Sequence, residues 1–215
     1  MVSDPAPLTP EYIASRWPCL FHMAEAGSWE SIRSHGLLST SALLDLFEVQ
    51  GADRVRIESS KRSESVEITH PKHGSAWIRD NKPINETVLR RTLVGMSEGD
   101  WYRTLNSRVF FWLTEERLNR LRNAPPYKSR AHDILTIDTG ALLERYAAQV
   151  ELAHLNTGAV HPSAKYPRGR GTFQTIPRYL WPERVRAARA EPIVELTIPY
   201  AVPDIADFTI GIATH

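Results

Sequence analysis

Short clusters of apolar residues, separated by polar turns, recur along the chain and predict short buried β-strands. The aromatic run RVFFWL at 108–113 is continuous enough to predict a central strand. The other strand-like runs occupy residues 20–23, 133–138, 150–155, 171–176, 192–198 and 206–213.

Helical spacing and capping residues predict several short helices between these strands. Ser28 and Gly36 are suited to begin and end one helix, and Ser97 with Asp100 forms a weakened capping box for another at 98–106. Further helices are predicted at 39–50, at 85–95, after Thr114 and at 139–147.

Residues 53–79 have a different pattern, in which apolar and polar positions alternate. The apolar positions are Val55, Ile57, Val66, Ile68 and Trp77, with polar turns between them. This alternation predicts short strands in an exposed hairpin region.

The order of these elements indicates the fold class. Helices fall mainly in the first two thirds and strands in the last third, which predicts an α+β fold with a mixed or largely antiparallel sheet. Neither GxGxxG nor GxxxxGK[ST] occurs, which argues against Rossmann and P-loop folds. Without repeats or a Gly/Ser-rich linker, residues 1–215 are expected to form a single domain.

Composition places the chain among ordinary globular proteins, with 42% hydrophobic and 24% charged residues. No apolar run is long enough for a membrane helix and the first residues lack a secretory pattern, so a cytoplasmic protein with no membrane contact is expected. Cys19 is the single cysteine, and no histidine or carboxylate motif has metal-ligand spacing. We therefore expect neither a disulfide within the chain nor a metal site.

The net charge of +1 conceals a basic stretch at 156–191, which carries seven basic and two acidic residues. Its first part, residues 156–171, is rich in Gly and Pro and is called the basic loop below. Lys165, Arg168 and Arg170 lie there beside aromatic residues, a combination that suits phosphates and splayed bases. The three residues are candidate nucleic-acid contacts, although an ordinary solvated loop has the same composition.

Two further residues stand out because they are ionisable within apolar runs. His22 lies in LFHM, where a histidine is usually a core residue with one satisfied hydrogen bond. Glu195 lies in PIVELTI, where alternation alone would direct it to solvent, but a carboxylate turned inward would require a function or a partner. The pattern leaves both interpretations open.

Two segments resemble the ADP-ribosyltransferase superfamily, and most of all its DarT-type DNA ADP-ribosyltransferase toxins. LFHMAEAGSWESIRSHGLLST is similar to the opening of these proteins, in which a strand ending in a histidine precedes a loop and a short helix. IVELTIPYAVPDIADFTIGI is similar to the strand that carries their catalytic glutamate. The resemblance implies that His22 orients NAD and that Glu195 is catalytic.

A third segment, RVFFWLTEERL, corresponds to a strand that leads to an NAD-binding arginine in that family. The aligned position lies near Glu115, so Arg108 at the start of the strand is the candidate for the pyrophosphate, with Phe111 as a further NAD contact. Residues 51–107 have no counterpart in the resemblance.

The resemblance implies a split sheet with flanking short helices and transfer of ADP-ribose from NAD to a nucleic-acid base, with DNA favoured as the acceptor. It also implies a toxin or phage-defence role, with an antitoxin or immunity protein as a partner. Two alternatives remain open: a non-catalytic nucleotide or nucleic-acid binding module on the same fold, and an RNA 2′-phosphotransferase that uses NAD.

Overall fold

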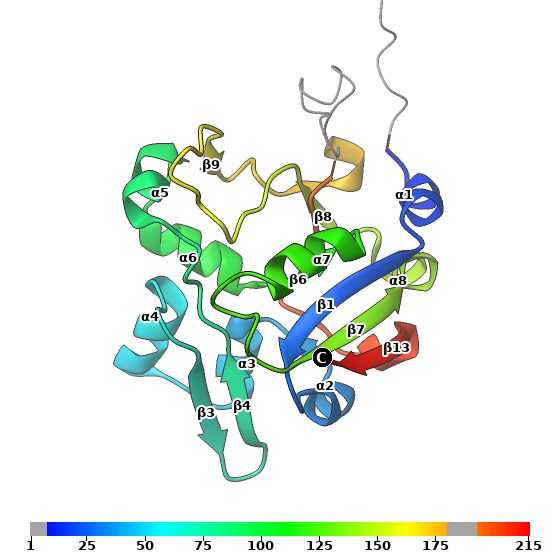
Figure 1. The fold of residues 1–215 in the computed structure, drawn as a ribbon, viewed down its shortest axis with the longest axis horizontal. Helices are drawn as coiled ribbons and strands as arrows, with labels where there is room; N and C mark the ends of the chain where they lie inside the picture. Colours follow the sequence, from blue (N-terminus) through cyan, green and yellow to red (C-terminus); the bar gives the residue numbers. More distant parts are fainter. Residues whose placement is uncertain (1–7, 180–192) are drawn as a thin grey trace, which may run out of the picture.

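The computed structural model describes residues 8–179 and 193–215, and its centre is a seven-stranded antiparallel sheet flanked by short helices (Figure 1). The strand order is β10-β8-β11-β6-β1-β7-β13. The strands are β1 (Cys19–Glu25), β6 (Arg108–Trp112), β7 (His132–Asp138), β8 (Glu151–Ala153), β10 (Gln174–Thr175), β11 (Glu195–Pro199) and β13 (Thr209–Thr214). The predicted α+β class and the largely antiparallel sheet are confirmed.

The pairing of the sheet is uneven and weakest at its middle. β1 pairs with β7 along its whole length, whereas its register with β6 is limited to Phe21 opposite Trp112. β6 in turn pairs along its whole length with β11. The sheet therefore divides almost completely between β1 and β6 into two halves. One half contains β10, β8, β11 and β6, and the other contains β1, β7 and β13.

Eight α-helices occur in the described ranges, and several begin at the predicted caps. The side chains of Ser39, Ser97 and Thr114 each accept a hydrogen bond from a backbone N–H of the first turn, and Ser97 with Asp100 completes a capping box. The helices are α1 (Pro10–Arg16), α2 (Trp29–His35), α3 (Thr40–Leu46), α4 (Gly51–Ser59), α5 (Glu86–Thr92), α6 (Glu98–Asn106), α7 (Glu115–Arg122) and α8 (Thr139–Tyr146).

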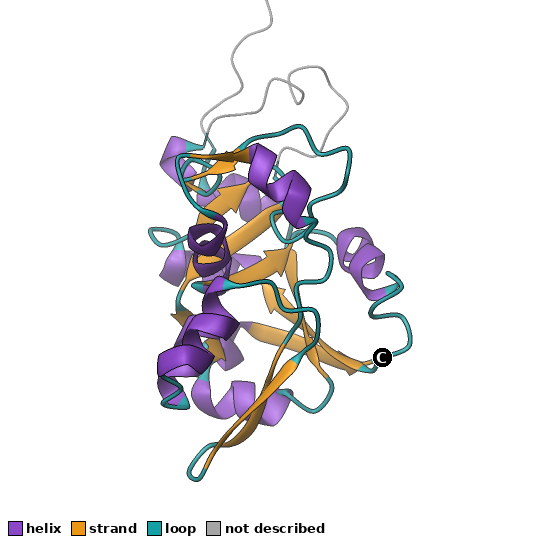
Figure 2. Ribbon diagram, turned by 90° about the vertical axis from the view of Figure 1, so that its left-hand side faces the viewer, coloured by secondary structure: helices purple, strands orange, loops and turns teal. Residues whose placement is uncertain are grey.

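Three small two-stranded sheets and two 3₁₀-helices complete the described structure. The sheets pair β2 (Leu37–Leu38) with β12 (Ala201–Val202), β3 (Val66–His70) with β4 (Gly74–Ile78), and β5 (Leu93–Val94) in parallel with β9 (Arg168–Gly169). The 3₁₀-helices are η1 (Ile176–Arg178) and η2 (Ile205–Phe208). The β3–β4 hairpin projects from the main sheet (Figure 2).

Gly36 ends α2 as predicted, and its backbone requires glycine for two reasons. Its φ of 86° is in the region that favours glycine, and a Cβ there would lie 2.5 Å from the Cα of Pro203. This close approach keeps the end of α2 against the segment that follows β12.

Residues 53–59 correct the sequence prediction, because they lie in α4 and not in a strand. Val55 is 56% exposed and Ile57 only 2% exposed. Residues two positions apart lie on nearly opposite faces of a helix. A helix therefore explains why Val55 is exposed and Ile57 is buried. The hairpin predicted from Val66 to Trp77 is confirmed as β3 and β4.

Several predicted strands in the last third of the chain are shorter than expected, among them 150–155, which is limited to β8, and 192–198, in which β11 begins only at Glu195. Within 171–176 the strand is limited to β10, and within 206–213 the first residues form η2 before β13 begins at Thr209. Residue 192, where the strand at 192–198 was predicted to begin, lies outside the described residues. Strands at 20–23, 108–113 and 133–138 are confirmed.

Three larger hydrophobic cores hold these layers together. The main core fills the space between the large sheet and α1, α2 and α8. A second joins α5 and α6 to β8, and a third lies between α3, α4 and the β3–β4 hairpin. None of the helices in the described part of the chain has the length and apolar character needed to cross a membrane.

Candidate functional site

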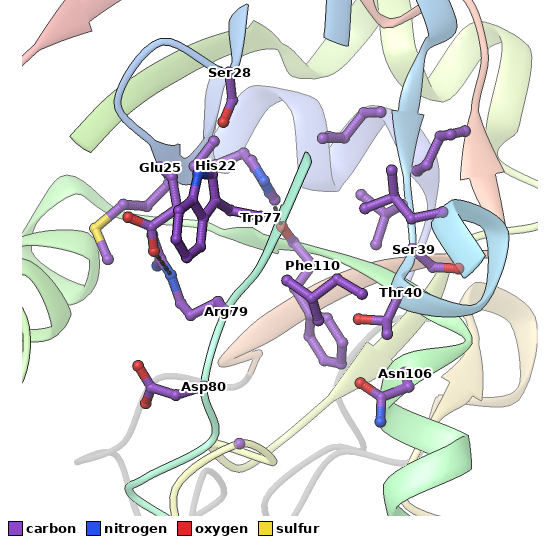
Figure 3. A pocket seen from close by; sticks show the side chains of 18 of the residues that line it. His22, Glu25, Ser28, Ser39, Thr40, Trp77, Arg79, Asp80, Asn106 and Phe110 are labelled. Atoms are coloured by element: carbon purple, nitrogen blue, oxygen red, sulfur yellow. Dashed lines mark hydrogen bonds and ion pairs between the residues drawn. The ribbon is translucent and has the colours of Figure 1, made fainter. Parts of the chain in front are cut away.

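A cavity of about 530 Å³ opens beside the point where β1 and β6 separate (Figure 3). Its walls come from β1, α2, α3, β4, β6 and the loop that follows β8. The sequence-predicted residues His22, Arg108, Phe111 and Glu195 all line it. The volume lies within the range of about 300–1,000 Å³ that is typical of small-molecule sites.

His22 lies on β1 and bridges the gap between the two halves of the sheet. Its Nδ1 lies 2.9 Å from the carbonyl oxygen of Phe110 on β6, and because a carbonyl can only accept, Nδ1 is the protonated nitrogen (Figure 3). Burial lowers the pKa of His22 to about 4, and the positive charge of Arg79 lowers it further, against the hydrogen bond to Phe110. At neutral pH the ring is uncharged, and Nε2 is a hydrogen-bond acceptor.

Glu195 begins β11, between β6 and β8, opposite Trp112 and Ala153. Only 3% of the residue is exposed, so the alternative in which Glu195 faces solvent is excluded. The backbone N–H of Thr157 lies 3.1 and 3.2 Å from the two carboxylate oxygens, and the Thr157 hydroxyl donates to one of them at 2.6 Å.

Burial raises the pKa of Glu195 to about 7, because the charged form loses its hydration. The hydrogen bonds from Thr157 and the charges of Arg117 and Arg168 act in the opposite direction. The carboxyl group therefore titrates close to neutral pH, which is the range in which a general base is effective.

Arg108 lies at the other end of β6 and is held by groups of the protein. Its Nε donates to Glu151 at 2.7 Å, and its guanidinium lies over the ring of Phe173, 4.4 Å from the ring centroid. It also borders a second hollow of about 380 Å³, which Arg170 borders too. The ion pair with Glu151 neutralises much of the charge that a pyrophosphate would need.

Phe111 belongs mainly to the central core, where it is 1% exposed. Its ring packs edge-on against the ring of His22, with 6.1 Å between the centroids. The main contact of Phe111 with the site is therefore its support of His22.

The basic loop separates into exposed and buried cations. Lys165 and Arg170 are exposed, and neither lines the large cavity. Arg168 is only 4% exposed, and its guanidinium donates to the carbonyl oxygens of Tyr166, Asn156 and Ala159. This corrects the prediction for Arg168, because a guanidinium bonded to loop carbonyls inside the protein does not reach a surface phosphate. Residues 180–191 of the basic stretch lie outside the described residues.

Two cavity residues, Trp77 and Arg79, were missed by the sequence analysis. Both lie at the end of the β3–β4 hairpin, and Trp77 is 48% exposed (Figure 3). Arg79 lies 3.7 Å from Glu25 of β1, and burial lowers its pKa. The sequence signal was a tryptophan two positions before an arginine, a spacing that places both side chains on one face of an extended segment.

Among the residues that the structure describes, no group of three or more His, Cys, Asp or Glu side chains could hold a metal ion. The cavity residues described above provide an uncharged imidazole, a buried carboxyl group, two ion-paired arginines and an indole.

Comparison with known proteins gives one match, which extends over residues 18–209 and so includes both His22 and Glu195. The matching model is described as a family of unknown function, DUF7002. No curated protein matches the chain. No solved structure matches it either. Because the match covers almost the whole chain, the protein belongs to the DUF7002 family.

Proposed function

We propose that the protein is an NAD-dependent mono-ADP-ribosyltransferase with a split-sheet fold and that the large cavity binds NAD. The observation that supports this proposal most directly is the convergence of His22 and Glu195, from opposite ends of the chain, on one cavity. The separation of β1 from β6 beside them supports the fold assignment.

In the proposed reaction the bond between C1′ of the ribose and the nicotinamide nitrogen breaks, and its electron pair leaves with nicotinamide. A nucleophilic atom of the acceptor forms the new bond to C1′, and the proton it loses passes to the carboxylate of Glu195. The ionised carboxylate also stabilises the positive charge that develops on the ribose. A carboxyl group with a pKa of about 7 can do both, because a large fraction is ionised at neutral pH.

The other cavity residues have complementary roles in this proposal. The Nε2 of His22 accepts a hydrogen bond from a ribose hydroxyl or an amide of NAD, because Nδ1 already donates to Phe110. Arg79 is better suited to the pyrophosphate than Arg108, because its ion pair with Glu25 is 3.7 Å long whereas Arg108 is held by Glu151 at 2.7 Å. Trp77 offers an exposed ring face on which a planar base can stack.

The proposed acceptor is a nucleic-acid base, with DNA favoured. Lys165 and Arg170 are exposed on the basic loop, where they are available to phosphates. The proposal includes a cytoplasmic toxin or phage-defence role, in which an antitoxin or immunity protein would restrain the activity.

One observation favours a second candidate, a non-catalytic nucleotide-binding module. Both carboxylate oxygens of Glu195 are already bonded to Thr157, as they would be if Glu195 only anchored the loop. Both candidates bind NAD, but only the transferase breaks the bond to nicotinamide.

Incubation with labelled NAD and, separately, DNA, RNA and protein tests the proposal, with nicotinamide release and acceptor mass as readouts. The parent should transfer ADP-ribose to a nucleic acid. Glu195→Gln should still bind NAD but lose about 10²- to 10⁴-fold in rate. Glu144→Gln, which removes an exposed carboxylate on α8, is the matched control and should keep the parent rate.

Each other outcome has a defined consequence. A parent that binds NAD but releases no nicotinamide with any acceptor supports the binding module. A parent that does not bind NAD overturns both candidates, and full activity in Glu195→Gln removes Glu195 from the reaction.

A further inference from the structure

The loop that follows β8, residues 156–159, contacts both the large cavity and Glu195. Asn156, Gly158 and Ala159 line the large cavity. Thr157 is fully buried and directs both its backbone N–H and its hydroxyl to Glu195. At 2.6 Å, the bond from the hydroxyl has the length of a charge-assisted hydrogen bond to a carboxylate.

We infer that Thr157 is a positioning residue, which holds the Glu195 carboxylate in one orientation at the cavity wall and stabilises its anionic form. The consequence of this inference for ADP-ribose transfer rests on the proposed function, but the interaction itself does not.

The loop can act in this way because it is itself held by Arg168 and by the segment at Pro83 and Ile84. Arg168 donates to the carbonyl oxygens of Asn156 and Ala159, at 3.4 and 3.3 Å. Val160 forms a parallel bridge with Ile84, and its N–H donates to the carbonyl oxygen of Pro83 at 3.0 Å. Donors fixed before the reaction stabilise a charge without a cost of reorganisation, so a rigid loop is the arrangement that a positioned carboxylate requires.

The protonation of Glu195 is a balance between burial and these donors. Arg117 of α7 and Arg168 of the basic loop are the cations that act on it, and the hydrogen bonds from Thr157 lower its pKa more than either. Removal of the Thr157 hydroxyl takes away one of the interactions that lower the pKa of Glu195, while burial continues to raise it. The titration midpoint of Glu195 should then rise by roughly one unit, and the ionised fraction at pH 7 should fall from about a half to about a tenth.

Three variants isolate the hydroxyl. Thr157→Val removes it and keeps the branched shape and the backbone N–H, while Thr157→Ser keeps it. Thr197→Val is the matched control, because Thr197 is a buried threonine of β11 whose hydroxyl donates to the carbonyl oxygen of Glu151 at 3.1 Å.

The direct measurement is NMR titration of ¹³C-labelled glutamate carboxyl groups, in which the Glu195 resonance is assigned by its loss in Glu195→Gln. The midpoint should rise in Thr157→Val and stay near the parent value in Thr157→Ser and Thr197→Val. Equal midpoints in the parent and in folded Thr157→Val overturn the inference, as does an equal rise in Thr197→Val.

A second measurement uses only the parent, in case Thr157→Val does not fold. Because the Thr157 N–H donates to the carboxylate, its amide shift should follow the titration of Glu195. A Thr157 amide that does not respond to that titration overturns the inference.

The pH dependence of nicotinamide release connects the inference to the proposed function. Its acid limb should move upward in Thr157→Val, with kcat lowered more than the affinity for NAD, and Thr157→Ser should restore it. If the parent releases no nicotinamide, the proposed function fails, while the carboxyl titration still decides the role of Thr157.

Discussion

At the scale of single residues, burial moves the two ionisable groups of the cavity in opposite directions. It raises the pKa of Glu195 to about 7 and lowers that of His22 to about 4, because in each case the charged form loses its hydration. Near neutral pH the imidazole is therefore uncharged while the carboxyl group titrates. The cavity therefore contains one group that titrates near neutral pH and one that stays uncharged there.

The raised pKa of Glu195 predicts a pH-dependent stability. Between its ordinary value of 4.5 and about 7, the folded state binds more protons than the unfolded state, so this group makes folding less favourable as pH rises. Glu195→Gln removes the ionisable group and with it this decrease in the free energy of unfolding. From pH 5 to pH 8 the variant should gain roughly 2 kcal/mol in unfolding free energy relative to the parent.

Urea unfolding of both proteins at the two pH values measures this gain. Glu144→Gln is the control and should show a much smaller change, because solvent screens an exposed carboxylate. A constant difference between Glu195→Gln and the parent at both pH values contradicts the raised pKa.

Substitution of His22 tests its proposed contact with NAD. His22→Ala removes the Nε2 acceptor and should weaken NAD binding by about 1 to 3 kcal/mol, the usual cost of an unsatisfied buried polar partner. Calorimetric titration with NAD measures the loss, and His161→Ala, at an exposed histidine of the basic loop, is the control. Unchanged affinity in folded His22→Ala removes His22 from the binding site.

At the scale of elements, two segments outside the large sheet shape the cavity. The β3–β4 hairpin brings Trp77 and Arg79 to it, and the ion pair of Arg79 with Glu25 connects the hairpin to β1. The basic loop begins at the cavity wall and then carries its exposed cations to the surface. Arg168 holds its two ends together from inside.

The division of the basic loop predicts two different effects of losing a cation. Replacement of Lys165 and Arg170 by Ala should lower the slope of log K against log salt by about 0.9 for each lost duplex phosphate contact, or about 0.7 on single strands. NAD affinity and stability should stay near the parent values. Arg168→Ala should instead lower the unfolding temperature, because its bonds to loop carbonyls are lost.

DNA and RNA binding at several salt concentrations, with thermal unfolding in parallel, measures both effects. Replacement of Lys72 and Lys128, two exposed lysines outside the loop, removes the same charge and should leave the salt slope unchanged. If the slope is the same in the parent and the loop variant, the loop does not contact phosphates, and a protein or small-molecule acceptor is favoured.

At the scale of the whole molecule, the order of the strands joins the two ends of the chain. β1 lies near the middle of the sheet, between β6 and β7, while β11 and β13 from the end of the chain lie on either side of that group. His22 of β1 and Glu195 of β11 line one cavity because only β6 lies between their strands in the sheet. The site therefore combines residues from both ends of the described chain.

This arrangement predicts a single cooperative unfolding transition, in spite of the weak pairing between β1 and β6. Urea unfolding followed by tryptophan fluorescence and by far-UV circular dichroism should give coincident midpoints. Separate midpoints would indicate that the halves of the sheet, or the hairpin with α3 and α4, unfold independently.

Local sequence signals determined most of the elements. The caps at Ser39, Ser97 and Thr114 and the apolar runs at 108–113 and 133–138 act through neighbours a few residues away, so the pattern alone predicts them. Short-range pattern failed at Val55 and Ile57, where one exposed and one buried position fit a helix as well as a strand. His22 and Glu195 were also recognisable from the chain as ionisable residues in apolar runs.

Tertiary structure alone decided which of these side chains are buried and which line the cavity. β11 is buried on both faces by segments distant in the sequence, so Glu195 turns inward although alternation allowed it to face solvent. The same packing turns Arg168 inward, places Thr157 against Glu195 and brings Trp77 and Arg79 to the cavity. Whether a side chain is buried depends on how the layers of the fold pack together. For these residues the segments that cover them are distant in the sequence, so the local pattern does not predict their burial.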